Sequence, residues 1–311
     1  MPASFPKALP MVSGILNINK PGGLSSFQVV AAVRRLTRER KVGHGGTLDP
    51  AAMGVLPVFL NHATRLVEYF FDTRKAYCAR IVLGATTDSY DAEGQFLTKS
   101  DPSGVTREQV EEVLRSFEGE VDQIPPMHSA LKHKGQRLYE LARAGMEVER
   151  APRRIKIYDI RLVEWDPPAL VIQVECGKGT YMRSIAQDLG QKLGCGAYQE
   201  RLIRIQDGPF SIEDGLTLEE LEAACREGYW KDLVLPMDEV LLQWQAVILN
   251  KAGQDAFLRG QALNLKPPRK TSRPPAGSPF CRVYSGGGDL LAVARLDPYT
   301  GLCQPQKVLY P

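Results

Sequence analysis

The spacing of hydrophobic residues along the chain predicts short strands and amphipathic helices. Gly14 to Asn19 alternates between apolar and polar positions, as a half-buried strand does, and runs into a Lys-Pro-Gly-Gly turn. Ser25 and Ser26 are suitable N-caps for a helix that continues through Leu36. Similar patterns predict strands over residues 76–83, 155–164 and 170–175, and an apolar stretch at 55–59. They predict further helices over 62–73, 106–117, 137–145, 180–193 and 217–227.

Other segments lack this periodicity. Residues 84–104 are rich in Gly, Asp, Thr and Ser and are predicted to form a loop, and residues 119–136 are predicted to form an exposed, mobile excursion. Beyond Leu242 the pattern changes to short strand candidates, interrupted by a Pro-, Lys-, Arg- and Ser-rich spacer at 266–279. These candidates lie at 246–249, 280–284, 290–296 and 307–309. We therefore predict a domain boundary near residue 240, followed by a small β-rich domain.

The composition is that of an ordinary globular protein. A chain of 311 residues suggests about two domains. With 43% hydrophobic and 24% charged residues, wholesale disorder and a fibrous architecture are excluded. No apolar run approaches the ~18 residues that a membrane span needs. The six cysteines are widely spaced without a CxxC pair and form no ligand pattern with the four histidines, so we expect a reducing, cytoplasmic location and no metal.

The charge is distributed unevenly along the chain, although the net charge is only +3. Residues 1–50 carry seven basic and two acidic side chains, and residues 121–161 carry nine and five. Residues 241–280 carry six basic and one acidic side chain, whereas residues 213–240 carry two and nine. Local positive patches are typical of a surface that contacts phosphates, although simple solvated faces have the same composition.

The most unusual motif is GHGGTLDPAAMG at residues 43–54. Its glycines allow unusual backbone angles and close approach to another chain. Asp49 precedes Pro50, a pattern that is typical of a helix start, and a functional carboxylate is the alternative. The same choice between a structural and a functional role applies to His44. Neither GxxxxGK[ST] nor GxGxxG is present, which excludes a phosphate-binding loop of those types.

Three further features could act together with Asp49, and each has a structural alternative. Tyr77 lies near the start of a predicted strand and could stack beside the loop or simply pack. Arg183, in GKGTYMRS (177–184), could pair with a carboxylate or lie on the surface. The third feature is a positive cluster that could bind phosphates or be solvated, formed by Arg150, Arg153, Arg154 and Lys156.

Six sequence blocks together resemble the TruB-type tRNA pseudouridine synthases. They occur in the order that the family shows, over about residues 14–210, and the GHGGTLDP block is highly specific. The blocks are KPGGLSS (20–26), KVGHGGTLDPAAMGVLPV (41–58), the Arg-Lys-Ala-Tyr run ending at Tyr77, LGATTDSYDAEG (83–94), PPMHSALKHKG (125–135) and GKGTYMRSIAQDLG (177–190). FLRGQAL (257–263) resembles, more loosely, the family's C-terminal PUA RNA-binding domain.

This resemblance implies roles for individual residues. Asp49 matches the catalytic aspartate, Tyr77 the tyrosine that stacks on the target base, and Arg183 the arginine that pairs with the aspartate. His44 matches the histidine that enters the T loop as the uridine leaves its stack. Lys20 and Pro21 match the motif that supports the active-site loop, and Leu202 matches an apolar residue of the uracil pocket. Lys132, in the basic excursion, and Arg204 are predicted to bind RNA.

The implied reaction converts the T-loop uridine of tRNA, at position 55, to pseudouridine. The C1′–N1 bond is exchanged for a C1′–C5 bond with no net gain or loss of atoms, so we expect no cofactor. The base must be flipped out of its loop, and an aspartate can then act covalently at C1′ of the sugar or at C6 of the ring. Two positions depart from the family pattern: His128 replaces a frequent tyrosine, and Ile203 interrupts a Leu-Arg-Arg run.

The implied fold is α+β, with a central, mostly antiparallel sheet flanked by helices and a small C-terminal β-rich, PUA-like domain. The catalytic domain is expected over 1–240, with an RNA-gripping excursion at about 119–150, and the second domain over 241–311. The expected partner is the T stem-loop of tRNA, and a monomer is the default state. Two other functions stay open. One is an RNA-binding or RNA-folding protein that makes little use of catalysis; the other is a guide-RNA-dependent synthase of the related branch.

Overall fold

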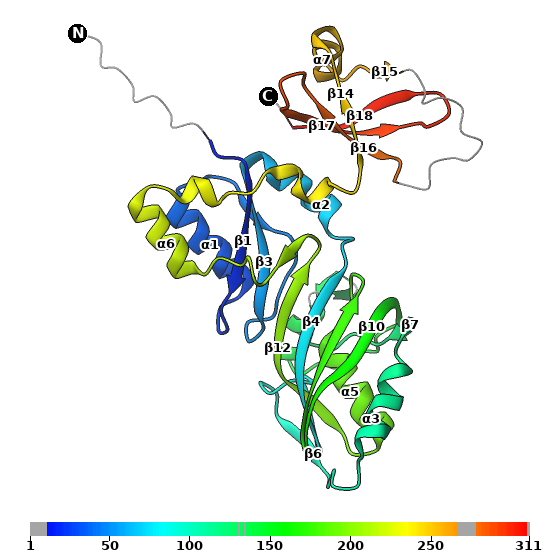
Figure 1. Cartoon of the computed structure of the whole chain (residues 1–311). Coiled ribbons are helices and arrows are strands. Elements are labelled where there is room, and N and C mark those ends of the chain that lie inside the picture. Colours follow the sequence, from blue (N-terminus) through cyan, green and yellow to red (C-terminus); the bar gives the residue numbers. More distant parts are fainter. Residues whose placement is uncertain (1–10, 130, 134, 266–277, 310–311) are drawn as a thin grey trace.

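The structure, a computed structural model, describes residues 11–309 apart from 130, 134 and 266–277. Within that part of the chain, a nine-stranded sheet lies in the larger body and a five-stranded sheet in the smaller one at the top of Figure 1. Two short hairpins accompany them. The predicted α+β class, with a small C-terminal β-rich domain, is confirmed.

The larger sheet has the strand order β1-β3-β12-β4-β11-β10-β7, and β2 and β13 pair with β3 and β12. Its described pairs are antiparallel except for β3 with β12, so the mostly antiparallel character is as predicted. The strands are β1 (Gly14–Lys20), β2 (Val42–His44), β3 (Met53–Leu60), β4 (Lys75–Leu83), β7 (Gly119–Gln123), β10 (Arg153–Asp166), β11 (Ala169–Cys176), β12 (Ala197–Asp207) and β13 (Phe210–Ser211).

Helices cover this sheet in two groups. α1 and α6 lie side by side next to β1 and β3 and share one apolar core with them (Figure 1). α3 and α5 pack together against β10 and β12 and enclose a second core. These helices are α1 (Ser26–Thr37), α3 (Arg107–Arg115), α5 (Met182–Leu193) and α6 (Leu218–Glu227). No helix in the described ranges is both long and apolar enough to cross a membrane.

Local sequence explains where three of these helices begin. Ser25, Thr106 and Thr217 each accept a hydrogen bond from the backbone N–H three residues on. The side chain of that third residue, a glutamine or a glutamate, accepts a bond from the cap residue in return. This reciprocal arrangement satisfies N–H groups that have no partner inside the helix. Ser25 is the N-cap of α1, as the sequence pattern predicts.

The five-stranded sheet has the order β14-β16-β17-β18-β15 and closes over its own core together with α7. Trp244 and Phe280 pack with Tyr69 of the larger body, so an apolar interface joins the two bodies. The elements are β14 (Gln245–Ile248), α7 (Lys251–Leu258), β15 (Leu263–Asn264), β16 (Phe280–Tyr284), β17 (Leu290–Leu296) and β18 (Leu302–Val308).

Several elements differ from the sequence prediction. The predicted helix over 62–73 is a 3-10 turn, η1 (Asn61–Leu66), followed by the short α2 (Val67–Phe70). The predicted loop over 84–104 contains a hairpin of β5 (Ala85–Thr87) and β6 (Phe96–Lys99).

The predicted excursion begins with β7, which pairs with β10 in the main sheet, and only the rest lies outside that sheet. That remainder contains β8 (Lys132–His133), β9 (Gln136–Arg137) and α4 (Leu138–Arg143). The long strand β12 and the helix α7 were not predicted, and most of the 266–279 spacer lies outside the described residues.

Candidate active site

The loop that carries Asp49 spans residues 45–52, between β2 and β3. No helix begins at Asp49 in this described loop, so the helix-cap interpretation of Asp49 is wrong. Ser26, in the first turn of α1, fixes the residue before Asp49. Its hydroxyl accepts a hydrogen bond from the Leu48 N–H at 2.8 Å and donates one to the Leu48 carbonyl at 3.1 Å. The Asp49 side chain, held in this way, is 42% exposed.

Lys20 fixes the other side of the loop. Its ammonium donates to the carbonyl oxygens of Pro50 at 3.0 Å and Ala52 at 2.6 Å, and to that of Pro21 at 2.9 Å. Lys20 is fully buried, and burial lowers its pKa to about 8, while the nearby Asp49 charge opposes the change. Lys20 therefore holds the Asp49 loop at Pro50 and Ala52, and Pro21 accepts from the same ammonium.

Arg183, near the start of α5, binds the Asp49 carboxylate. Its Nη2 atom lies 3.0 Å from Asp49 Oδ2, and its Nη1 atom lies 3.6 Å from Asp91 Oδ2. The guanidinium also donates to the backbone carbonyls of His128 at 2.8 Å and Ser89 at 3.5 Å. Its side chain is only 5% exposed. Arg183 is thus a buried anchor that orients a half-exposed carboxylate, and through His128 it ties the excursion to the same point.

Tyr77 and Leu202 lie in the apolar cluster that also contains Leu48. Tyr77 is on β4 and is 8% exposed, and burial raises its pKa to about 12, so the phenol is neutral at physiological pH. Leu202 lies on the neighbouring strand β12, opposite Ala79 of β4. Asp49 is thus the residue that follows Leu48, a member of an apolar cluster that also contains the aromatic ring of Tyr77.

Two residues near Asp49 were missed by the sequence analysis. Asp91 is the second carboxylate that faces Arg183, with a side chain that is 15% exposed. Tyr181 precedes α5, and its backbone N–H and carbonyl are both hydrogen-bonded to the Gln123 side chain, at 2.8 and 3.0 Å. Burial raises the pKa of Tyr181. The Arg183 charge opposes this rise, and the Asp49 charge adds to it. Both residues lie inside blocks that signalled the family, but nothing local distinguishes them from their polar neighbours.

The remaining predicted residues occupy different positions. His44 ends β2, and burial lowers its pKa, with the Arg204 charge acting in the same direction. Lys132 lies in β8, within the excursion. The predicted RNA contact of Arg204 does not fit its position. Its side chain is 1% exposed and points into the protein, where it donates to backbone carbonyls. A charge buried among such partners does not reach a ligand at the surface.

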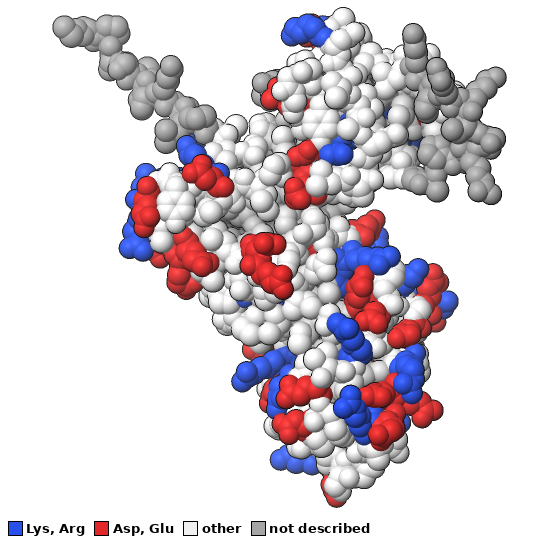
Figure 2. Space-filling view, viewed as in Figure 1, with Lys and Arg blue, Asp and Glu red and all other residues white. Residues whose placement is uncertain are grey.

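On the face that Figure 2 shows, basic side chains lie among acidic ones. Figure 2 shows Lys and Arg interspersed with Asp and Glu around β10 and β7, and acidic side chains around α6. A surface hollow of about 430 Å³ lies beside β10. Its lining includes Arg154, Lys156, Tyr158 and Lys178, together with the acidic Asp72 and Glu120.

Comparison with known proteins places this geometry in context. Residues 34–182 match the family model described as TruB family pseudouridylate synthase (N terminal domain), and residues 183–242 match the tRNA pseudouridylate synthase B C-terminal domain. A protein of Dehalococcoides mccartyi named tRNA pseudouridine synthase B is 47% identical over 298 residues, 96% of each chain. One from Clostridium tetani with the same name is 42% identical over 77% of this chain and 82% of its own.

A solved archaeal structure is also similar. It is described as the archaeal box H/ACA sRNP Nop10-Cbf5 complex, and the matching chain is 25% identical. The match has a TM-score of 0.71 and covers 98% of this chain and 89% of that one. The likeness therefore extends over the larger body and the C-terminal β-rich domain alike.

Proposed function

Because the chain belongs to the TruB family of pseudouridylate synthases, we propose that it converts uridine 55 in the T loop of tRNA to pseudouridine. One observation carries the proposal: the buried Arg183 guanidinium lies 3.0 Å from the half-exposed Asp49 carboxylate. A charge-assisted pair of this kind keeps a carboxylate ionised and oriented while leaving one side of it open to a substrate.

The residues around Asp49 suit this isomerisation. The Asp49 carboxylate attacks the flipped nucleotide, at C1′ or at C6, and the C1′–N1 bond breaks. The uracil turns, C5 bonds to C1′, and the bond between Asp49 and the nucleotide breaks, which restores the free carboxylate. The C5 hydrogen leaves as a proton and N1 gains one. Tyr77 offers a neutral aromatic ring on which the base stacks, and Leu202 closes the apolar side of the pocket. The reaction rearranges atoms that the substrate already contains, so a positioned carboxylate and proton exchange with water are sufficient.

Other parts of the chain would hold the RNA. We assign residues 1–240 to catalysis and 241–311 to RNA binding, because the two sheets share no strand in the described ranges. The excursion at about 119–150, which includes Lys132, would grip the T stem-loop. A small cluster around Met127, Leu138 and Leu141 gives this excursion its own packing. His44, neutral because burial lowers its pKa, would enter the loop as the uridine leaves its stack.

The proposed enzyme acts alone, as a monomer, in the cytoplasm, where tRNA is found. Relatives that are 39–47% identical carry the name tRNA pseudouridine synthase B, whereas the similar Cbf5 chain was solved within an H/ACA complex and is 25% identical. This difference favours direct action on tRNA over dependence on a guide RNA. Asp49 pairs with Arg183, and Tyr77 belongs to the same apolar cluster as Leu48, which supports an enzyme rather than a protein that only binds RNA.

The test is turnover on a bare tRNA transcript without accessory proteins. We expect wild-type protein to form pseudouridine on this transcript, and no product when position 55 is changed to cytidine. Asp49→Asn keeps the shape of the side chain and removes its charge, so tRNA should bind as to wild type while product is abolished. Asp214→Asn, at an exposed carboxylate in the acidic segment, is the matched control and should retain full activity.

Each other result has a clear meaning. Comparable activity of Asp49→Asn would refute the role of Asp49. Wild-type protein that becomes active only with a guide RNA would favour the guide-dependent function. Tight binding without turnover under either condition would favour the RNA-binding function.

A further inference from the structure

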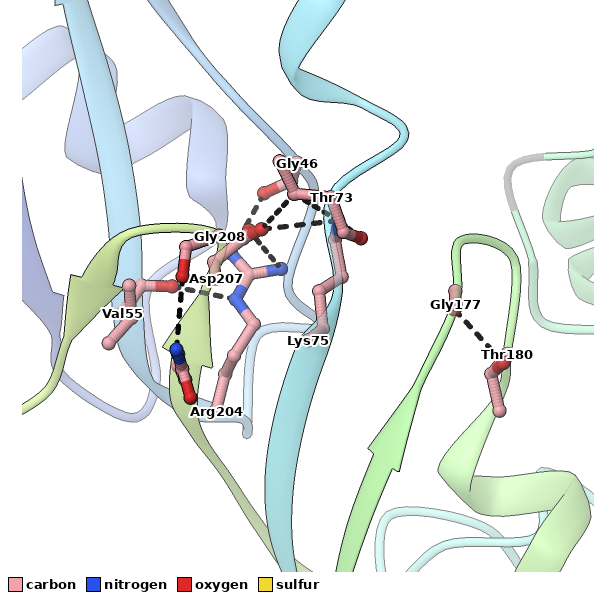
Figure 3. Close-up of polar contacts among 10 residues, drawn as sticks. Gly46, Val55, Thr73, Lys75, Gly177, Thr180, Arg204, Asp207 and Gly208 are labelled. Atoms are coloured by element: carbon pink, nitrogen blue, oxygen red, sulfur yellow. Dashed lines mark hydrogen bonds and ion pairs between the residues drawn. The ribbon is translucent and has the colours of Figure 1, made fainter. Parts of the chain in front are cut away.

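Next to the start of the Asp49 loop lies a buried charged cluster that the proposed chemistry does not use (Figure 3). Arg204 and Asp207, both on β12, are 1% and 0% exposed. Asp207 Oδ2 lies 3.4 Å from Arg204 Nη1, and Oδ1 lies 3.1 Å from Lys75 Nζ and accepts a bond from the Thr73 hydroxyl at 3.0 Å. Two cations thus share one carboxylate away from water. Well-packed apolar residues in place of a buried ion pair often leave a protein equally stable or more stable. A buried charged cluster of this kind therefore suggests a role other than stability.

Arg204 reaches from this cluster to both sides of the loop that carries Asp49. Its Nε atom donates to the Val55 carbonyl at 2.7 Å, on β3 just beyond the loop. Its Nη2 atom donates to the Gly46 carbonyl at 3.2 Å, near the start of the loop (Figure 3). A Cβ at Gly46 would lie 3.4 Å from Arg204 Nη1, so the guanidinium packs directly against the loop at this position. One rigid group therefore joins the two ends of a glycine-rich loop that has few side chains of its own to pack.

The same guanidinium lies beside Tyr77. Arg204 and Tyr77 are directly opposite each other on β12 and β4, so their side chains share a face of the sheet. Burial raises the pKa of Tyr77, and the charge of Arg204 and a hydrogen bond from it oppose that rise. Asp207 is opposite Lys75 on the same two strands, which extends the contact to the start of β4. Arg204 thus donates to the Asp49 loop on one side and lies opposite Tyr77 on the neighbouring strand on the other.

We propose that Arg204, oriented by Asp207, is a positioning residue that sets the Asp49 loop against the Tyr77 ring without touching RNA. The inference rests on the proposed function, because it concerns the placement of the two residues proposed to act on uridine. Arginine suits this role because its planar fork donates in several fixed directions at once, which a lysine ammonium does not do. The role replaces the RNA contact that the sequence predicted for Arg204.

The test separates positioning from binding. In Arg204→Gln we expect kcat on tRNA to fall about 100-fold, the loss typical of a small misplacement of reacting groups. The Kd for tRNA and its salt dependence should stay at wild-type values. Asp207→Asn should lower kcat in the same direction by a smaller factor. A direct phosphate contact would produce the reverse: a higher Kd, a salt slope reduced by about one, and kcat unchanged.

A matched control addresses a merely structural role. Phe210 is a buried residue of β13 and lies opposite Asp207, at the end of β12. Phe210→Leu removes buried volume there and breaks no polar contact with the Asp49 loop. It should lower the melting temperature and leave kcat intact. The pKa of His44, followed by NMR, adds a second readout: the Arg204 charge lowers it, so it should rise in Arg204→Gln and stay unchanged in Phe210→Leu.

Every result of this design is decisive. Arg204→Lys serves if Arg204→Gln does not fold, because it keeps the charge but cannot donate in all the same directions, and kcat should again fall while Kd holds. Wild-type kcat in both Arg204→Gln and Arg204→Lys, or a loss of kcat no greater than that in Phe210→Leu, would overturn the proposal. An inactive wild-type protein would overturn the proposed function instead, and the His44 titration would then still test the placement of Arg204.

Discussion

Replacing Arg183 by glutamine tests the centre of the proposed mechanism. The substitution removes the cation that lies 3.0 Å from Asp49 and 3.6 Å from Asp91. At 3.0 Å, and at an effective dielectric constant of about 20, the attraction is about 5–6 kcal/mol. Because the Asp49 side chain is 42% exposed, water screens part of this, which leaves about 2–3 kcal/mol, the upper part of the range for a charged hydrogen bond. If this is lost in the transition state, kcat falls about 30- to 150-fold.

The assay follows from the chemistry. Because C5 loses its hydrogen when it bonds to C1′, tRNA labelled with tritium at C5 of uridine releases the label to water at each turnover. Saturating tRNA isolates kcat, and a thermal melt confirms that each variant is folded at the assay temperature. Arg183→Lys should lose less activity, because it keeps the charge but not the fork that reaches both carboxylates.

Arg80→Gln is the matched control for this experiment. It breaks the ion pair of Arg80 with Glu200, at 2.6 Å on two adjacent strands, where both side chains are about one-third exposed. Pairs at the surface contribute little, so activity should be unchanged. Full kcat in Arg183→Gln would refute the reasoning, because Asp49 would then need no partner.

Three other predictions concern RNA binding and pH. If the cluster at 150–156 meets phosphates, log Kd should rise steeply with log salt, and a flat response would exclude the contact. Deletion of everything after residue 240 should weaken tRNA binding and leave measurable turnover at high tRNA; a folded truncation without turnover at saturation would mean that the tail helps to build the site. Burial lowers the pKa of His44 in the folded state, so the unfolded chain binds more protons and stability should fall as pH drops below about 6.5. Chemical denaturation of His44→Gln should show a smaller loss over the same pH range, and an equal loss would count against this assignment.

The local features of this fold were predictable from the sequence. Ser25 caps α1 through atoms three residues away, and the period of apolar residues in α5 and α6 depends only on the turn of the helix itself. The GHGGTLDP block and its companions indicated the family and pointed to Asp49, Tyr77 and Arg183. The structure then places Arg183 and Asp49 in an ion pair.

Other features were decided only by the tertiary structure. β12 was missed because its charged residues resemble a surface segment, although Arg204 and Asp207 are among its most buried positions. Their partners, Gly46, Val55 and Lys75, come from the Asp49 loop, β3 and β4. The order of the strands, which sets β12 between β3 and β4, therefore buries Arg204 against the Asp49 loop instead of leaving it at the surface. Local sequence reports the conformation of a segment, but the burial of a charge depends on which distant groups can pair with it, and only the assembled sheet brings those groups together.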